Sequence, residues 1–309
     1  MSWNFELAAG PFGSPIDGPV WDGEALLFTR QAFPANSVNN RILRFDPTNG
    51  QTTDFRRWTN QTIGLGFSKT GTLYGCQWAG RRLVRFNGDG TTSALSHKIG
   101  GLYHNKPKDL VVDSQERIWF CDPHGDLRTA IYPQISDKLN HASVLRLQTP
   151  DAFDSPIQRM TFDTDAPSGI LLSRDEGTLY LAESSLEPDG PRELRAYPVL
   201  EDGTLGNYAL LHSFGADAQG PHLGIAGMCL DSDGNVVACA GWNQSGPGPL
   251  VYVFSPAGRV LETHPAPEEA TNCAFGDPDL TTLYLTTKSG NLYRALSTGH
   301  TGWTLYQSG

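Results

Sequence analysis

Short apolar runs alternate with polar turns along the whole chain, and helical periodicity is almost absent. Runs rich in β-branched and aromatic residues, such as "EALLFTR", "GTLYLAES" and "LVYVFSPAGRVLETH", are separated by Gly, Asp and Asn. Many short strands at even spacing indicate an all-β fold.

The strand pattern also repeats. Segments of similar sequence begin at intervals of about 45 to 60 residues. They start at Asp17 in "DGPVWD", Ile63 in "IGLGFS", Lys108 in "KDLVVD", Ser168 in "SGILLS", Ala226 in "AGMCLD" and Asn272 in "NCAFGD". Six units of about four strands predict a six-bladed β-propeller with four-stranded antiparallel blades around a central channel. We interpret residues 1–309 as one domain, in which the longer units hold loop insertions such as "HGDLRTAIYPQISDKLNHAS".

This repeat has a consequence for chemistry, because the first strand of each propeller blade lines the channel. The six starting positions are therefore expected to form a ring of residues that face one another. Lys106 and Asp109 lie beside Lys108 in the stretch "KPKD". We expect the N-terminal segment to close the ring by pairing with the C-terminal strands.

Composition narrows the class of protein. The chain is 39% hydrophobic and 18% charged, which suits a globular protein with a core. A net charge of −10 without a basic run disfavours nucleic acid and anionic membranes as partners. We expect a small-molecule substrate instead, and the sequence carries no signal for a particular oligomeric state.

The five cysteines are widely spaced without a CxxC pair, which favours buried, reduced thiols. No signal-peptide pattern opens the sequence, and no apolar run is long enough to span a membrane. We therefore expect a cytoplasmic protein.

Several segments, taken in order, resemble one known family. They include "DGPVWDGEALLF", "KPKDLVVDSQERIWFCDP", "SGILLSRDEGTLYLAES", "AGMCLDSDGNVVACAGW" and "TNCAFGDPDLTTLYLTT". Together they are similar to the gluconolactonase, regucalcin (senescence marker protein) and luciferin-regenerating enzyme family. The resemblance covers nearly the whole chain. It implies a six-bladed propeller and metal-dependent hydrolysis of lactones or similar esters.

The metal-site motifs of that family are altered in this sequence. The family's metal-binding Glu of "EGP" is matched by Asp17, its Asn of "PNGL" by Ser168, and its Asp of "PDGM" by Ala226. The family's "RPND" is here "KPKD", which places Lys106 at the arginine and Lys108 at the asparagine. The second unit's usual "NGL" is "IGL".

These departures leave a weak ligand set for a divalent cation. Calcium takes six to eight oxygen ligands, and zinc takes about four N, O or S ligands. The ring offers oxygen ligands from Asp17, Ser168 and Asn272, and Asp109 beside it would be a further carboxylate ligand. The same ring holds the ammonium of Lys108, which repels a cation. We therefore expect no cofactor. Calcium or zinc held through Asp17 and Asp109 is the alternative.

The hypothesis that follows is that Lys108 supplies the positive charge that the family takes from its metal. Lys108 would stabilise an oxyanion, or act as a base or Schiff-base amine, and Asp17 would position it or activate water. Lys106 would bind a substrate carboxylate. The alternative is a structural ion pair of Lys108 and Asp17 that fills an inactive channel.

Further candidates lie on loops that would face the entrance to the channel. His104 is a candidate general base, and so are His124 and His222. Tyr103, Trp78 and Trp242 would form walls of a substrate pocket, although aromatic residues beside strands more often serve packing. The alternative is that these histidines are merely solvated, because a lone histidine on a loop more often has no functional role.

Three functions remain open from the sequence. The first is a lactonase-like hydrolase with Lys108 in place of the metal. The second is a metal-free, non-hydrolytic propeller enzyme that uses Lys108 for condensation, isomerisation or rearrangement of a carbonyl compound. The third is a binding propeller that has lost catalysis.

Overall fold

The strands form where the sequence predicts them, at short runs of β-branched and aromatic residues bounded by turns. The computed structural model describes residues 2–126, 130, 131, 135, 137–150 and 155–306. These residues form strands and turns but no helix. Accordingly, nothing in this part of the chain is a helix that could cross a membrane.

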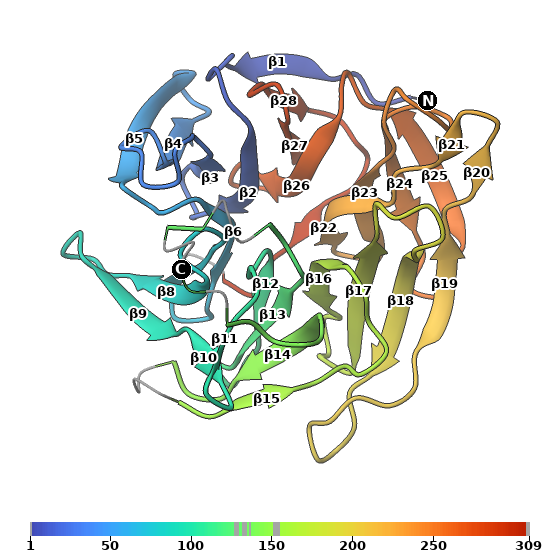
Figure 1. Ribbon diagram of the computed structural model, residues 1–309. Helices are drawn as coiled ribbons and strands as arrows, with labels where there is room; N and C mark the ends of the chain where they lie inside the picture. The colour runs from blue at the N-terminus through green and yellow to red at the C-terminus, as the bar shows by residue number, and fades with distance from the viewer. Residues whose placement is uncertain (1, 127–129, 132–134, 136, 151–154, 307–309) are drawn as a thin grey trace.

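Six antiparallel sheets of at least four strands surround a common axis (Figure 1). We number these sheets as blades 1 to 6. Blade 1 contains β2 (Ile16–Trp21), β3 (Leu26–Arg30), β4 (Arg41–Asp46) and β5 (Gln51–Arg57). Blade 2 contains β6 (Thr62–Phe67), β7 (Leu73–Gln77), β8 (Arg82–Phe86) and β9 (Thr92–Ser96). Blade 3 contains β12 (Leu110–Val112), β13 (Ile118–Asp122), β14 (Ser143–Leu147) and β15 (Ile157–Arg159).

The second half of the chain continues the pattern. Blade 4 contains β16 (Pro167–Leu172), β17 (Thr178–Ser184), β18 (Arg192–Pro198) and β19 (Ala209–Ser213). Blade 5 contains β22 (Ile225–Asp231), β23 (Val236–Ala240), β24 (Leu250–Phe254) and β25 (Val260–Pro265), with β29 (Gly302–Trp303) added beside β22. Blade 6 contains β26 (Ala270–Gly276), β27 (Thr282–Thr287), β28 (Leu292–Ala295) and β1 (Glu6–Ala9). The predicted six-bladed propeller is confirmed.

Two short hairpins extend the connections before blades 3 and 5. They are β10 (Lys98–Ile99) with β11 (Leu102–Tyr103), and β20 (Ala216–Asp217) with β21 (Gly220–Pro221). The insertion predicted after His124 connects β13 to β14, and part of it lies outside the described residues.

Several outer hairpins use the same turn chemistry. Asp46, Asp89 and Asp202 each accept a hydrogen bond from the backbone N–H two residues later, at 2.9 Å. The residue two positions on is a threonine in every case, and its hydroxyl donates to the same carboxylate. Such Asp-initiated turns fix the reversal between the third and fourth strands.

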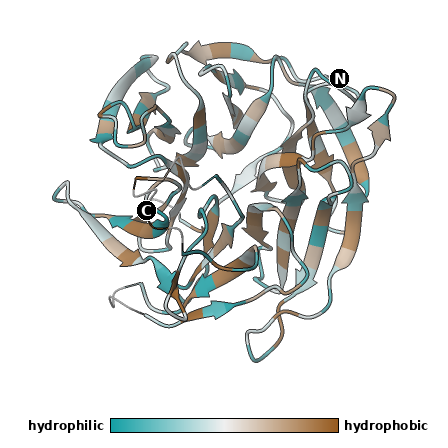
Figure 2. Ribbon diagram, in the orientation of Figure 1, coloured by the Kyte–Doolittle hydropathy of each residue, from teal (hydrophilic) through white to brown (hydrophobic). Residues whose placement is uncertain are grey.

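The apolar core is divided among the interfaces between neighbouring blades. Between blades 2 and 3, for example, Tyr74 and Leu83 pack with Phe120 and Leu145. A comparable cluster of buried residues lies at each of the other five interfaces. Hydrophobic stretches accordingly run through the strands of every blade (Figure 2). Each blade is therefore stabilised by the two blades beside it.

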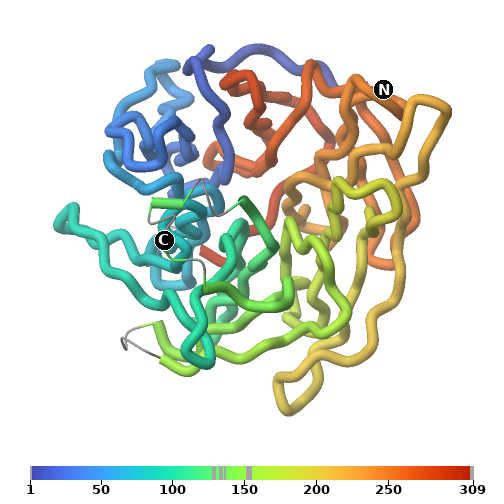
Figure 3. The backbone as a smooth tube through the Cα atoms, in the orientation of Figure 1, coloured from blue at the N-terminus to red at the C-terminus, as the bar shows by residue number. Residues whose placement is uncertain are grey.

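The N-terminal segment closes the ring, as predicted. Strand β1 pairs antiparallel with β28, with Leu7 opposite Tyr293, so the first strand of the chain completes the last blade. The Arg294 Nε donates to Glu6 Oε1 at 2.7 Å across this pair. In Figure 3 the blue start of the chain runs beside the red strands of blade 6.

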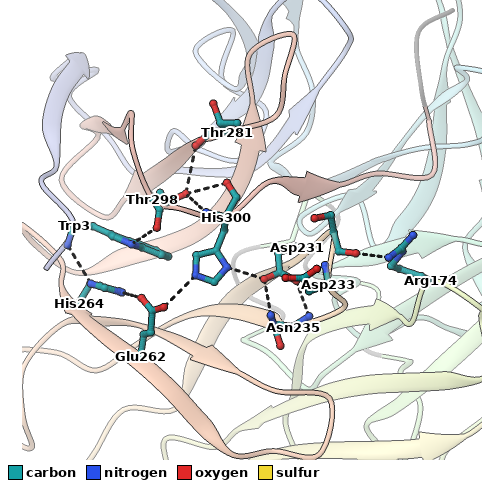
Figure 4. Close-up of polar contacts among 11 residues, drawn as sticks. Trp3, Arg174, Asp231, Asp233, Asn235, Glu262, His264, Thr281, Thr298 and His300 are labelled. Atoms are coloured by element: carbon teal, nitrogen blue, oxygen red, sulfur yellow. Dashed lines mark hydrogen bonds and ion pairs between the residues drawn. The ribbon is translucent and has the colours of Figure 1, made fainter. Parts of the chain in front are cut away.

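Trp3 provides a second contact at the closure (Figure 4). Its indole ring stacks on His264 with ring centroids 3.9 Å apart and planes inclined by 7°. Its Nε1 donates to the carbonyl of Thr298 at 2.9 Å, and its backbone N–H donates to His264 Nδ1 at 3.1 Å. Trp3 therefore joins the start of the chain to β25 and to the segment that follows β28, residues 296–306, which we call the C-terminal segment.

A chain of ionisable groups continues from His264 into the C-terminal segment (Figure 4). His264 Nε2 lies 2.8 Å from Glu262 Oε2, and Glu262 Oε1 lies 3.3 Å from His300 Nε2. His300 Nδ1 then lies 2.8 Å from Asp231 Oδ2. Because Nδ1 of His264 accepts from the backbone, its Nε2 is the nitrogen that donates to Glu262. This chain fixes the C-terminal segment at the end of β22.

The C-terminal segment then crosses the end of the channel. Trp303 pairs with Leu230 of blade 5, and three residues later Tyr306 stacks on Phe67 of blade 2 at 5.2 Å between centroids. We call this end of the channel, where the first strands finish, the floor. The opposite end, where the first strands begin, is the channel mouth.

We predict that Trp3→Ala lowers the free energy of unfolding by about 3 to 5 kcal/mol, because it removes a buried aromatic ring and leaves the Thr298 carbonyl without its donor. Trp58→Ala is the matched control, since Trp58 is 61% exposed and should change stability by about 0.5 kcal/mol at most. Urea denaturation measures both. Equal effects of the two substitutions would show that Trp3 does not stabilise the closure.

Candidate active site

The channel mouth is built from irregular starts of the first strands. In β16 the pairing passes from Pro167 to Gly169, so Ser168 is an extra residue without a partner on β17. The same irregularity skips Ala226 in β22. Lys108 precedes β12, where its N–H donates to Cys121 O at 3.0 Å and Cys121 N–H donates to Asp109 O at 2.9 Å. Such bulges turn a side chain away from the regular alternation of the strand, here at each ring position.

One predicted equivalence is off by one residue. In blade 6 the pairing passes from Ala270 to Asn272, so Thr271 is the extra residue that corresponds to Ser168. Asn272 instead occupies the next position, which Asp109 occupies in blade 3. The error arose because a bulge adds a residue that spacing alone does not reveal. Thr271 uses its hydroxyl structurally, donating to the carbonyl of Ile16 at 2.6 Å.

The position after the ring is glycine in four blades, which makes room for Asp109 and Asn272. A Cβ on Gly64 would lie 2.6 Å from the carbonyl oxygen of Lys108, to which the Gly64 N–H donates. A Cβ on Gly227 would collide with the side chain of Asn272. Glycine therefore lets neighbouring first strands approach closely enough to hold these two polar side chains at the mouth.

Asp17 is a buried carboxylate with defined partners. It is 7% exposed, and its Oδ1 accepts from the Gly18 N–H at 2.7 Å. Burial raises the pKa of Asp17 to about 6, while the positive charge of Lys108 and hydrogen bonds from Gly18 and the Asn272 side chain act against the increase. Asp17 can thus change its protonation state near neutral pH.

Asp109 lies close enough to Asp17 for their charges to interact. Burial, followed by the negative charge of Asp17, raises the pKa of Asp109 to about 7. The Leu110 N–H donates to Asp109 Oδ1 at 3.0 Å and acts against this increase. Two neighbouring carboxylates of this kind titrate as a pair, and the pair holds a proton more readily than free aspartates do.

Lys108 connects blade 3 to blade 4. Its Nζ donates a short hydrogen bond to Ser168 Oγ, and its positive charge acts on both Asp17 and Asp109. Ser168 is 4% exposed and its hydroxyl also lies 3.4 Å from the carbonyl of Ala226. The structure therefore gathers Lys108, Asp17, Asp109 and Ser168 at the mouth, together with Asn272. We call these five residues the Lys108 group.

Two candidates from the loop between β11 and β12 are buried. His104 is 0% exposed and packs edge-on against Phe120, with its Nε2 3.1 Å from Ser96 Oγ. Burial lowers the pKa of His104 to about 3, so its ring is neutral. Lys106 is also 0% exposed, with its Nζ over the Trp78 ring at 5.0 Å from the centroid. Burial lowers the pKa of Lys106 to about 8.

The remaining candidates lie on loops around the mouth. Tyr103 is half-buried, with Lys98 Nζ 4.4 Å from the centre of its ring. His222 Nε2 lies 3.3 Å from Asp217 Oδ2, and Trp242 Nε1 donates to Ser245 Oγ at 2.7 Å. None of these described contacts reaches the Lys108 group, so a role of these side chains in binding substrate remains a prediction. His124 is exposed on the loop after β13.

Sequence reasoning missed two buried carboxylates beside the mouth. Glu183 Oε2 accepts from the Ala166 N–H at 2.7 Å, directly before the strand that carries Ser168. Asp122 Oδ2 accepts from the Asn105 N–H at 2.8 Å, before the "KPKD" stretch. Burial raises the pKa of both acids to about 7. The signal was an acid at the same place in two repeats, at the ends of "IWFCD" and "TLYLAE".

The side chains at the mouth do not fit the divalent metal that the family resemblance implies. No group of three or more His, Cys, Asp or Glu residues is arranged to hold a metal ion within the described part of the chain. The two acids at the mouth, Asp17 and Asp109, instead interact with the positive charge of Lys108. Ala226 supplies no ligand atom from its side chain.

An apolar cavity of about 170 Å³ occupies the channel between the mouth and the floor. Asp109 and Asn272 border it on the side of the mouth, and Trp303 and Tyr306 border it at the floor. Apolar side chains of the first strands, such as Met228, form much of its wall. The Lys108 group thus lies above a channel whose far end is covered by the C-terminal segment.

Two curated relatives are similar to this chain over most of their length. The chain is 25% identical over 278 residues to pentonolactonase XacC of Haloferax volcanii, covering 89% of this chain and 82% of that protein. It is 27% identical over 277 residues to 6-deoxy-6-sulfogluconolactonase of Pseudomonas putida, covering 88% and 83%.

Solved structures share the fold of this chain. A gluconolactonase from Xanthomonas campestris is 28% identical, with a TM-score of 0.73 and coverage of 94% of this chain and 88% of that chain. A luciferin-regenerating enzyme shares the fold at 17% identity, with a TM-score of 0.73 and coverage of 98% of each chain. Residues 16–289 match the family described as SMP-30/Gluconolactonase/LRE-like region. The chain therefore belongs to this family, as its motifs had indicated.

Proposed function

We propose that the protein hydrolyses a lactone at the channel mouth, with the Lys108 ammonium in the place of a divalent metal. The relatives named as a pentonolactonase, a sulfogluconolactonase and a gluconolactonase support the lactone as substrate class. The observation that carries the proposal is the hydrogen bond from Lys108 to Ser168 beside two carboxylates. In this arrangement one positive charge and two proton acceptors lie together at the mouth.

Lys108 acts on the carbonyl oxygen of the lactone in this proposal. As water adds to the carbonyl carbon, negative charge develops on that oxygen, and a nearby ammonium stabilises it. Ser168 holds the ammonium by accepting its hydrogen bond, and Asp17 attracts it from blade 1. This arrangement is preorganised, because Lys108 is held from both sides before substrate binds.

Asp109 acts as the general base. Its ionised carboxylate takes a proton from the attacking water while the new carbon–oxygen bond forms. The tetrahedral intermediate then breaks its ring carbon–oxygen bond, and Asp109 returns the proton to the departing alkoxide. The product is the hydroxycarboxylic acid, so one water is consumed and Asp109 is restored. A pKa near 7 suits a group that must both accept and donate a proton.

We predict that Lys108→Met lowers kcat/KM by a factor of about 100 or more, because the stabilising charge on the oxyanion is lost. Hydrolysis of five- and six-membered sugar lactones, followed by acid release, measures this. Lys69→Met is the matched control, since Lys69 is exposed on a turn away from the mouth and should leave the rate unchanged.

The same assay distinguishes the ammonium from a metal. EDTA treatment followed by buffer exchange should leave wild-type hydrolysis intact, and added calcium or zinc should not increase it. Loss of activity with EDTA and its recovery with either ion would contradict the proposed role of Lys108. So would full activity in Lys108→Met.

We predict that kcat/KM rises with pH with a midpoint near 7, because burial and the charge of Asp17 raise the pKa of Asp109 to about 7 and only its ionised form accepts a proton. Below the midpoint the rate should fall about tenfold per pH unit. Asp109→Asn should remove this limb and lower the rate by a factor of about 100 or more. Rate profiles corrected for spontaneous hydrolysis measure both effects.

Asp89→Asn serves as the control for the pH profile. Asp89 is an exposed residue of the turn between β8 and β9, the outer strands of blade 2, and its carboxylate accepts from Thr91. Its substitution should leave the midpoint in place. A profile with an unchanged limb in Asp109→Asn would assign the base to another group and remove Asp109 from the mechanism.

A further inference from the structure

Three cysteine thiols meet where blades 5 and 6 adjoin the channel. Cys229 lies on β22, Cys239 on β23 and Cys273 on β26. The sulfur atoms of Cys229 and Cys273 are 3.7 Å apart, within hydrogen-bonding distance for two thiols and without a covalent bond. None of these three thiols takes part in the lactone hydrolysis proposed above.

Only two of the three thiols border the channel cavity. Cys229 and Cys273 line it, whereas Cys239 is fully buried between the blades and is not part of the cavity wall. A small polar molecule inside a cavity of about 170 Å³ can therefore reach the touching pair. This access separates Cys229 and Cys273 from cysteines that serve only as small apolar side chains.

The surroundings also make the two sulfurs chemically unequal. Hydrogen bonds from the thiols of Cys229 and Cys239 lower the pKa of Cys273. Burial, with the neighbouring Cys273, raises the pKa of Cys229. The more acidic thiol is the one that reacts first with an oxidant, and its neutral neighbour then serves as the second thiol.

We propose that Cys229 and Cys273 form a modification site, at which a small peroxide converts the two thiols to a disulfide. The Cys273 sulfur attacks one peroxide oxygen, which gives a sulfenic acid and releases water. The Cys229 thiol then attacks that sulfur, which forms the S–S bond and releases a second water. Hydrogen peroxide is reduced by two electrons, and the two thiols together lose two hydrogens.

Only a small movement is required for this bond. A disulfide has a sulfur–sulfur distance near 2.05 Å, so the two atoms must approach by roughly 1.7 Å. The new bond would join β22 to β26, two strands that belong to different sheets and share no ladder hydrogen bonds. It would close a loop between positions 44 residues apart, which restricts the unfolded chain.

The test treats the reduced full-length protein with a small excess of hydrogen peroxide and then alkylates the remaining thiols under denaturing conditions. We expect the number of free thiols to fall from five to three, with a mass loss of about 2 Da before alkylation. Cleavage both before Asp231 and after Arg259 places Cys229, Cys239 and Cys273 on three separate peptides, so the linked pair is identified directly. The melting temperature should rise by about 5 °C and return after reduction.

Serine variants show which two cysteines form the disulfide. Cys229→Ser and Cys273→Ser should each lose the crosslink and the rise in melting temperature. Cys76→Ser is the matched control, because Cys76 is a buried thiol of blade 2 and its variant should still form the crosslink. A Cys239–Cys273 link, or retention of all five thiols in folded protein, would overturn the proposal. These measurements need no substrate, so they are independent of the proposed lactonase activity.

Discussion

Packing between neighbouring blades is the constraint on which the rest of the structure depends. Each of the six interfaces holds its own cluster of buried apolar side chains, and the axis of the molecule is a channel rather than a core. Because every blade requires two neighbours, the ring is stable only when its last interface is formed. This explains why the start and end of the chain, through Trp3 and His300, are fixed to blades 5 and 6 by many specific contacts.

The same constraint brings the first strands close together at the mouth and makes that region electrostatically costly. Asp17 and Asp109 are held out of water near each other, so burial raises the pKa of each. A fold selected for stability alone would not keep two such carboxylates side by side. The Lys108 ammonium offsets part of this cost, and its hydrogen bond to Ser168 keeps it in place. Local rules of stability are commonly broken at sites of function.

Much of this architecture could be read from the sequence, because the spacing of apolar runs reflects the spacing of blades. The ring positions Asp17, Lys108 and Ser168 followed from the repeat. In blade 6 the repeat put the ring position at Asn272, one residue after its true place at Thr271, since a bulge changes the register without changing the period. Burial of His104 and Lys106 was also invisible, because it depends on loops packed from other parts of the chain. The same holds for the floor, whose C-terminal segment resembles no repeat.

That floor determines how molecules can travel through the protein. A propeller channel open at both ends would let a reactant enter on one side and its product leave on the other. Here Trp303 pairs with blade 5 and Tyr306 stacks on blade 2, so the far exit is covered. Trp303 and Tyr306 therefore obstruct passage through that end of the channel. Under the proposed hydrolysis, the acid product and the next lactone would share the opening at the mouth, beside Lys108.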